Sequence, residues 1–235
     1  MPACAASPDQ LLEAGQAHHR KGDLAGAARC YHQVLDRAPD HAAACHLLGL
    51  VHGQSGDLTN AFVLIGRALV LDPALAEAHC DIGTFYRQTG QLAEAALSWR
   101  LAVAADPAMA RAWADLGLVL RELGEAGEDG GEDGEGGAIT ALYRAVALEP
   151  GRIEAQFALG CALDDAGRLD EAIEALRAVI TRRPRHAGAQ ARLGAVLMQL
   201  GRPAEALPAL QDAARLAPDA EVAAALAACR AALTA

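Results

Sequence analysis

The chain has 235 residues, enough for one large domain or two small ones. Hydrophobic residues make up 53% of it and aromatic residues only 3%, so apolar area must be buried through many small contacts. This composition suits packed helices better than an aromatic-centred β core. The formal net charge of −10 argues against nucleic acid or an anionic membrane surface as the main partner.

Neither a signal peptide nor a membrane span is expected. The first residues lack a basic region followed by an apolar core. The longest apolar runs, such as Ala61 to Ile65, are much shorter than a membrane-spanning helix, so we expect no membrane insertion. The six cysteines are scattered without a Cys-x-x-Cys pair, which favours free thiols and a cytoplasmic protein.

A fixed period runs through the chain. Prolines recur at spacings of 34, 34, 43, 34 and 34 residues, at Pro39, Pro73, Pro107, Pro150, Pro184 and Pro218. Two classes of glycine keep the same rhythm, at Gly15, Gly49, Gly83, Gly117, Gly160 and Gly194, and at Gly22, Gly56, Gly90, Gly124, Gly167 and Gly201. Alanines do so at Ala27, Ala61, Ala95, Ala138, Ala172 and Ala206. This agreement predicts six tandem repeats.

Each repeat predicts a helix, a turn and a second helix. An N-terminal tail at 1–7 precedes six repeats at 8–41, 42–75, 76–109, 110–152, 153–186 and 187–220. In the third repeat, the first helix is expected from Ala76 to Thr89 and the second from Leu92 to Ala105. Gly90 ends the first helix, and Pro107 prevents continuation of the second. The small residues Gly83 and Ala95 are expected where the two helices cross most closely.

The fourth repeat carries nine extra residues within an acidic, glycine-rich insertion at 125–137. Six of its thirteen residues are acidic and six are glycine, so it cannot bury apolar area and we expect a loop. Its carboxylates and glycines alternate as in some calcium sites, but their spacing departs from that of an EF-hand loop. Another hypothesis is that this loop competes with acidic ligands for Arg87 and Arg121.

The residues from Ala76 to Pro107 carry a family pattern. The matching positions are His79, Ile82, Gly83, Tyr86, Ala95, Trp99, Ala102 and Pro107. With its period of 34, the chain resembles the tetratricopeptide repeat family over residues 8–220. The resemblance implies an all-α fold, a right-handed superhelical solenoid of helical hairpins with a concave groove that binds peptides.

In this family, the first helix of each repeat lines the concave side. The resemblance therefore implies a partner-binding groove lined by Glu77, Cys80, Asp81, Thr84, Arg87, Gln88, Arg111, Asp115, Leu118, Arg121, Glu122, Phe157, Asp164 and Asp165. Arg87 and Arg121 hold equivalent positions in successive repeats. Asp81 and Asp115 do likewise, and such a ladder suits an extended peptide. The alternative is that these charges pair along a solvated surface and bind nothing.

Two sub-patterns of the family are missing. Members that clamp a C-terminal carboxylate carry Lys and Asn in the first repeat, where this chain has Leu12 and Gln16. Sugar-transferase arms carry an asparagine ladder, where this chain has Glu13, Leu47, Asp81, Asp115, Ala158 and Arg192. The repeats still resemble the arms of bacterial multi-repeat proteins. An accessory or targeting arm for a separately encoded glycosyltransferase or sulfotransferase is therefore the alternative function.

No arrangement of residues predicts catalysis or a cofactor. His18 and His52 share one position in adjacent repeats, which favours half-buried packing residues over a metal site. The basic run from Thr181 to His186 spans a turn and is expected to be solvated. Because no nucleophile, base and orienting group assemble, we expect a non-catalytic protein–protein interaction scaffold that needs no cofactor or metal.

Residues 221–235 predict a capping helix in register with the first helix of a seventh repeat. This segment is apolar on most faces, and such a helix is normally buried. We therefore expect self-association or a partner protein at this end of the chain.

Overall fold

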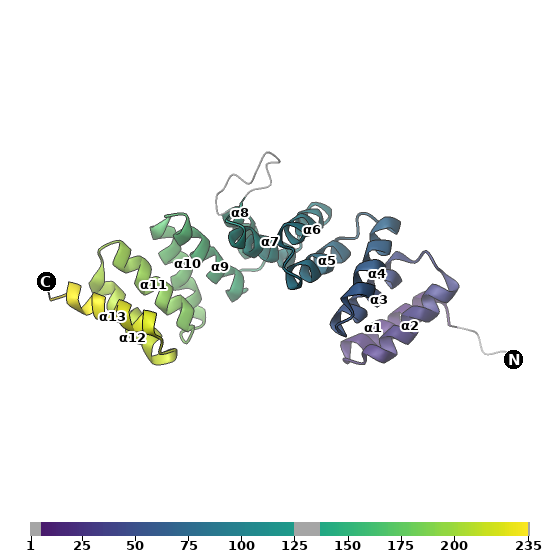
Figure 1. The fold of residues 1–235 in the computed structure, drawn as a ribbon, viewed down its shortest axis with the longest axis horizontal. Coiled ribbons are helices and arrows are strands. Elements are labelled where there is room, and N and C mark those ends of the chain that lie inside the picture. The colour runs from purple at the N-terminus through teal and green to yellow at the C-terminus, as the bar shows by residue number, and fades with distance from the viewer. Residues whose placement is uncertain (1–5, 125–136, 235) are drawn as a thin grey trace. The chain divides into compact units, whose positions relative to one another are not determined.

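The computed structural model describes residues 6–124 and 137–234. Within these ranges the chain forms thirteen α-helices joined by turns and short irregular segments, and no strand (Figure 1). The all-α solenoid of helical hairpins expected from the sequence is confirmed. The insertion at 125–137 lies outside the described residues except for Gly137, so the expected loop stays a prediction.

The chain divides into two compact units, residues 1–107 and 108–235. The first unit contains three hairpins, formed by α1 (Pro8–Arg20) with α2 (Leu24–Arg37), α3 (Ala42–Gln54) with α4 (Leu58–Leu71), and α5 (Ala76–Gln88) with α6 (Leu92–Ala105). The second unit contains α7 (Ala110–Glu122) with α8 (Ala138–Leu148), α9 (Ile153–Asp165) with α10 (Leu169–Arg182), α11 (Ala187–Gln199) with α12 (Pro203–Leu216), and α13 (Ala220–Ala232).

Local sequence signals place the helix ends. The α5 helix stops at Gln88 with Thr89 as its C-cap, and α6 spans the predicted Leu92–Ala105. Gly90 has φ of +79°, a left-handed conformation that favours glycine and lets the chain reverse between the two helices. The predicted third hairpin is therefore confirmed to within one residue.

One contact recurs at the centre of every hairpin. A glycine in the first helix lies against a large side chain of the second, in the pairs Gly15–Tyr31, Gly49–Ile65, Gly83–Trp99, Gly117–Leu142, Gly160–Leu176 and Gly194–Leu210. A Cβ atom built on any of these glycines would lie 3.0 Å or less from that side chain. The large partners are at most 1% exposed. Because glycine has no side chain, the large residue fits against the first helix and the two helices pack closely.

The close crossing expected between Gly83 and Ala95 has a counterpart in two other hairpins, where a Cβ on Gly49 or Gly117 would lie 3.1 Å from the carbonyl oxygen of Ala61 or Ala138. A Cβ on Gly83 would meet the indole of Trp99, one turn beyond Ala95. The indole Nε1 also donates a hydrogen bond of 3.1 Å to the carbonyl oxygen of Cys80, which satisfies its buried N–H. In this hairpin, the glycine therefore makes room for an aromatic ring.

Histidine–aspartate pairs close two hairpins of the first unit. Nδ1 of His18 lies 2.7 Å from Oδ2 of Asp23, which caps α2. Nδ1 of His52 lies 3.1 Å from Oδ2 of Asp57, which caps α4. The half-buried histidines expected from the sequence thus join the end of one helix to the N-cap of the next. Within the described residues, no group of three or more His, Cys, Asp or Glu side chains is placed to hold a metal ion.

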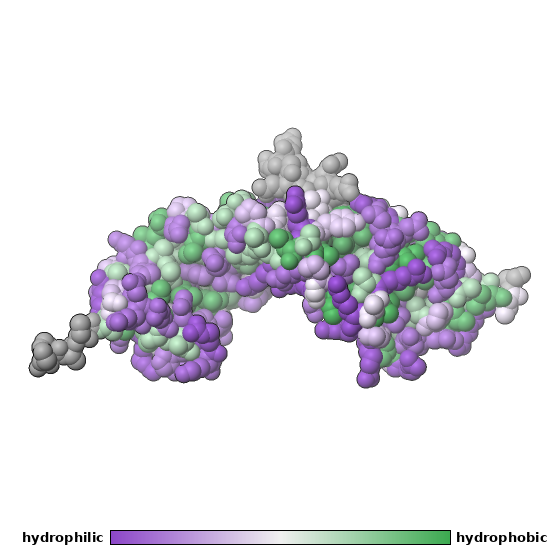
Figure 2. Space-filling view, turned by 180° about the vertical axis from the view of Figure 1, so that it is seen from behind, coloured by the Kyte–Doolittle hydropathy of each residue, from purple (hydrophilic) through white to green (hydrophobic). Residues whose placement is uncertain are grey.

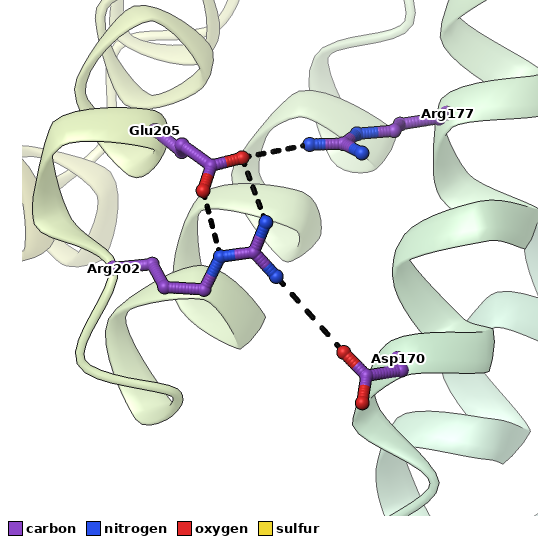
Figure 3. A network of polar contacts seen from close by, with 4 residues as sticks. All are labelled: Asp170, Arg177, Arg202 and Glu205. Carbon is purple, nitrogen blue, oxygen red and sulfur yellow. Dashed lines mark hydrogen bonds and ion pairs between the residues drawn. The ribbon is translucent and has the colours of Figure 1, made fainter.

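Arginine–glutamate pairs lie at the start of second helices in the second unit. Arg202 donates to Glu205 through Nε (2.7 Å) and Nη2 (2.8 Å), and Arg177 of the preceding hairpin donates to Glu205 at 3.0 Å (Figure 3). Asp170 lies 3.9 Å from the same Arg202 side chain. The Arg202 hydrogen bond holds the pKa of Glu205 below its ordinary value. This network links neighbouring hairpins at the surface.

The C-terminal helix α13 starts one residue before the predicted segment and packs on α12 and α11. It buries Val222 and Cys229, whereas most of its alanines are exposed, among them Ala224, Ala227 and Ala228. Ala228 falls where the first helix of each hairpin has the packing glycine. Association through this helix stays a prediction.

Apolar residues are interspersed with polar ones on the face seen in Figure 2. Cys30 is half-buried, whereas Cys45, Cys80, Cys161 and Cys229 are buried, and none of these five described cysteines forms a disulfide bond. Among the described helices, none is long and apolar enough to cross a membrane.

The glycine contact predicts opposite effects for two substitutions in one hairpin. In Gly49→Ala, the new Cβ would lie 2.7 Å from Cγ1 of Ile65, and we expect a loss of about 1–3 kcal/mol in the free energy of unfolding. In Gly66→Ala, the new Cβ meets no atom within 4 Å, and we expect a gain of about 0.5–1 kcal/mol. Urea unfolding followed by circular dichroism measures both. Equal stability of Gly49→Ala and the wild type would contradict the packing argument.

The capping pairs predict a pH dependence. Hydrogen bonds from Asn60, and then from His52, hold the pKa of Asp57 below its ordinary value of 3.8. A lowered pKa means that this carboxylate contributes stability above pH 3.8 and loses it as the pH falls below that value. Asp57→Asn keeps an oxygen that can cap α4 but removes the charge. We expect its urea midpoint to lie below that of the wild type at pH 6 and to converge with it at pH 3. Asp36→Asn, at an exposed position on α2, is the control and should show no such trend.

Candidate functional site

The first helices of successive hairpins form a common face in the second unit. In order, α7 packs on α9, α9 on α11, and α11 on α13. Every third or fourth residue of a helix lies on the same side, so the four helices present one residue set to one surface. The sequence period therefore places equivalent positions of successive repeats next to one another.

A groove of about 370 Å³ lies on this face. Its lining residues come from all four first helices and from α12, and they are Arg121, Phe157, Cys161, Gly188, Ala191, Arg192, Ala195, Leu210, Glu221, Val222 and Ala225. The small residues of α11 leave the middle of the groove hollow, with Phe157 on one side and Val222 on the other. Its mostly apolar lining with a few charged groups suits a binding site.

The structure brings together several predicted groove residues of the second unit. Arg121 and Phe157 line the groove directly, and Asp164 and Asp165 pair with its arginines. Of the remaining predicted residues, Arg111 Nε lies 3.6 Å from Asp115 Oδ2, an i,i+4 pair along α7. Leu118 is half-buried against a hydrophobic cluster, and Glu122 is exposed.

The predicted residues of the first unit all lie on α5. Cys80 and Asp81 are buried, Thr84 and Arg87 are half-buried, and Glu77 and Gln88 are exposed. Oδ2 of Asp81 lies 2.9 Å from Nε2 of His46 on α3, so this carboxylate joins two first helices. Thr84 donates through its hydroxyl to the carbonyl oxygen of Cys80 at 3.1 Å. A ligand for Asp81 would therefore have to compete with His46.

Two arginines and two aspartates form a chain of ion pairs at the groove of the second unit. Asp165 Oδ2 lies 3.3 Å from Nη1 of Arg121, and its other oxygen contacts Nη2 of Arg192. Asp164 Oδ2 lies 2.6 Å from Nε of Arg192. The chain joins α7, α9 and α11 through side chains of opposite charge, and it neutralises Arg192 from two sides.

Burial perturbs two groups beside this chain. The side chain of Asp164 is only 6% exposed, and burial raises the pKa of its carboxyl despite the opposing effect of Arg192. Burial likewise raises the pKa of the Cys161 thiol, again against the effect of nearby arginines. A raised pKa lowers the thiolate fraction of Cys161 at neutral pH and so weakens it as a nucleophile.

Several lining residues are absent from the set predicted by resemblance. On α11 and α13 these are Gly188, Ala191, Arg192 and Ala195, and Glu221, Val222 and Ala225. Those on α11 hold the same repeat positions as the predicted residues of the fourth and fifth repeats. Extending the same positions to the sixth repeat and to the capping helix would have found all except Glu221.

Tandem antiparallel hairpins whose first helices share a grooved face define the class of helical repeat proteins. The profile of the tetratricopeptide repeat matches residues 12–78, 80–134 and 157–221. These matches cover most of the chain, and the chain belongs to the tetratricopeptide repeat family. Among curated protein sequences, none matches it significantly.

Solved structures of similar fold include interaction proteins. The chain is 26% identical to YrrB, described as a tetratricopeptide repeat protein with an unusual peptide-binding site, with a TM-score of 0.76 over 87% of this chain and 100% of YrrB. It is 28% identical to MamA, with a TM-score of 0.60 over 74% of this chain and 96% of MamA. Cut9 with Hcn1, from a hetero-tetramer of the APC/C, shares the fold at 16% identity, with a TM-score of 0.64 over 95% of this chain and 42% of the matched chain.

The ion-pair chain predicts a pH-dependent loss of stability in Arg192→Met. Removing this arginine leaves the nearly buried Asp164 carboxylate without its closest cation, and we expect a cost of about 1–3 kcal/mol at pH 7. Because the pKa of Asp164 is raised, the carboxyl takes up a proton as the pH falls, and the cost should shrink. The double variant Arg192→Met/Asp164→Asn should recover part of the loss at pH 7. Urea unfolding at pH 7 and pH 4.5 measures these differences, and a cost independent of pH would contradict this account.

Proposed function

We propose that this protein is a non-catalytic interaction scaffold that holds an extended segment of a partner protein in the concave groove of its second unit. The observation that carries the proposal is the groove on α7, α9, α11 and α13, which combines a hollow apolar floor with charged side chains at its edges. A peptide in extended conformation presents alternate side chains to such a surface. The likeness to YrrB supports a peptide as the ligand.

The chemistry of the groove supports binding rather than catalysis. Its two arginines face aspartates, its thiol is held protonated by burial, and its floor is made of alkyl and aromatic groups. These groups can exclude water from an apolar side chain and donate hydrogen bonds to a peptide. The cytoplasmic location expected from the sequence belongs to the same proposal.

A peptide selection tests the proposal. The full chain is used to select from a random twelve-residue peptide library displayed on phage, and the most enriched peptide is synthesised with a fluorescent label. Its affinity is measured by fluorescence anisotropy for the wild type and for Ala195→Phe, which places a ring in the groove. We expect a loss of about tenfold or more, because a filled groove cannot admit the peptide.

Ala204→Phe is the matched control, since Ala204 is exposed on α12 and lies outside the groove lining. It should bind the peptide like the wild type. Failure to enrich any peptide, or equal affinity of Ala195→Phe and the wild type, would overturn the groove proposal. The alternative, an accessory arm for a separately encoded glycosyltransferase or sulfotransferase, would be supported if such a catalytic chain co-purified with the wild type and with Ala195→Phe alike.

A further inference from the structure

We infer that the groove of the second unit selects a segment with a defined charge order: an acidic residue toward α7, a large apolar residue in the middle, and a basic residue toward α13. The inference rests on the proposed function, because it names the ligand of the same groove. Three parts of the groove carry it.

The middle of the groove fits one large apolar side chain. On α11, Gly188, Ala191 and Ala195 present at most a methyl group toward the groove. Phe157 and Val222 stand on either side, and Leu210 of α12 closes the space beneath. A volume of about 370 Å³ that is lined mostly by carbon atoms gains most from an occupant that is itself apolar.

Arg121 supplies the positive end. Nη1 of Arg121 reaches Asp165 at 3.3 Å, and its buried Nε has no hydrogen-bond partner within the described residues. Asp165 is contacted more closely by Arg192, which also holds Asp164. Both aspartates therefore have Arg192 as a partner, and the other Nη donors of Arg121, whose side chain is 32% exposed, are available to a carboxylate from a ligand.

Glu221 supplies the negative end. It is exposed, it lines the groove from the first turn of α13, and no ion pair between residues of the described ranges involves it. Since α7, α9, α11 and α13 pack in that order, Arg121 and Glu221 lie on the first and last of the four helices. A ligand that crosses these helices therefore meets opposite charges at its two ends.

A charge-swap experiment tests this order. The probe is the most enriched peptide from the twelve-residue library, together with a synthetic copy in which its acidic and basic residues are exchanged. We expect the selected peptide to carry an acidic and a basic residue on opposite sides of a large apolar residue. The wild type should bind it roughly fivefold more tightly than the exchanged copy at low salt.

The double variant Arg121→Glu/Glu221→Arg should reverse this preference, because both ends of the groove then carry the opposite charge. A reversal cannot arise from partial unfolding, which would weaken both peptides alike. The matched control is Arg230→Glu/Glu174→Arg, at exposed positions outside the groove lining, and it should keep the wild-type preference. The neutral variant Arg121→Gln should weaken binding of the selected peptide and reduce its salt dependence.

The possible failures are distinguishable. If the library yields peptides that bind and are blocked by Ala195→Phe but lack this charge order, the groove proposal stands and the charge inference is wrong. The same holds if the double variant keeps the wild-type preference. If the wild type enriches no peptide, both the groove proposal and the charge inference are overturned.

Discussion

The structure depends on a single steric constraint, the absence of a side chain at one position of each first helix. At that position a glycine faces a large, fully buried residue of the second helix, six times along the chain. The large residue is an aromatic in two hairpins (Tyr31 and Trp99), Ile65 in one and leucine in three, but the space that receives it is the same. Helix spacing within each hairpin is therefore set by the backbone, and the side chains adapt to it.

The two units share this arrangement of hairpins but differ in the side chains that pair with their carboxylates. In the first unit, histidines pair with aspartates: His18 and His52 bridge to helix caps, and His46 joins α3 to α5 through Asp81. In the second unit, arginines pair with the carboxylates instead: with glutamates at the start of second helices and with aspartates along the groove. A guanidinium stays charged at all ordinary pH values and can donate two parallel hydrogen bonds to one carboxylate, as Arg202 does to Glu205.

Much of the fold could be predicted from the sequence because its signals are local. A proline ends a helix, and a glycine such as Gly90 allows a turn, whatever surrounds them, so the α5–α6 hairpin was expected within one residue. The side-chain arrangement was harder to predict, because it depends on partners one repeat away. Asp81 and Asp164 occupy positions assigned to the groove, yet each is drawn inward by a cation or histidine of a neighbouring helix. The hollow over Gly188, Ala191 and Ala195 forms only because residues of α9 and α13 line it together with α11, and the sequence of α11 alone does not indicate it.

Leu210 takes part in two features of the second unit. It fills the gap beside Gly194 in the last hairpin, and it forms part of the groove floor. A change at Leu210 would alter the shape of the groove only by disturbing the hairpin, whereas Ala191, Ala195 and Ala225 are half-buried and can change with less disturbance. Divergence of binding preference among related chains should therefore be confined to positions such as these alanines, while Leu210 is retained with the fold.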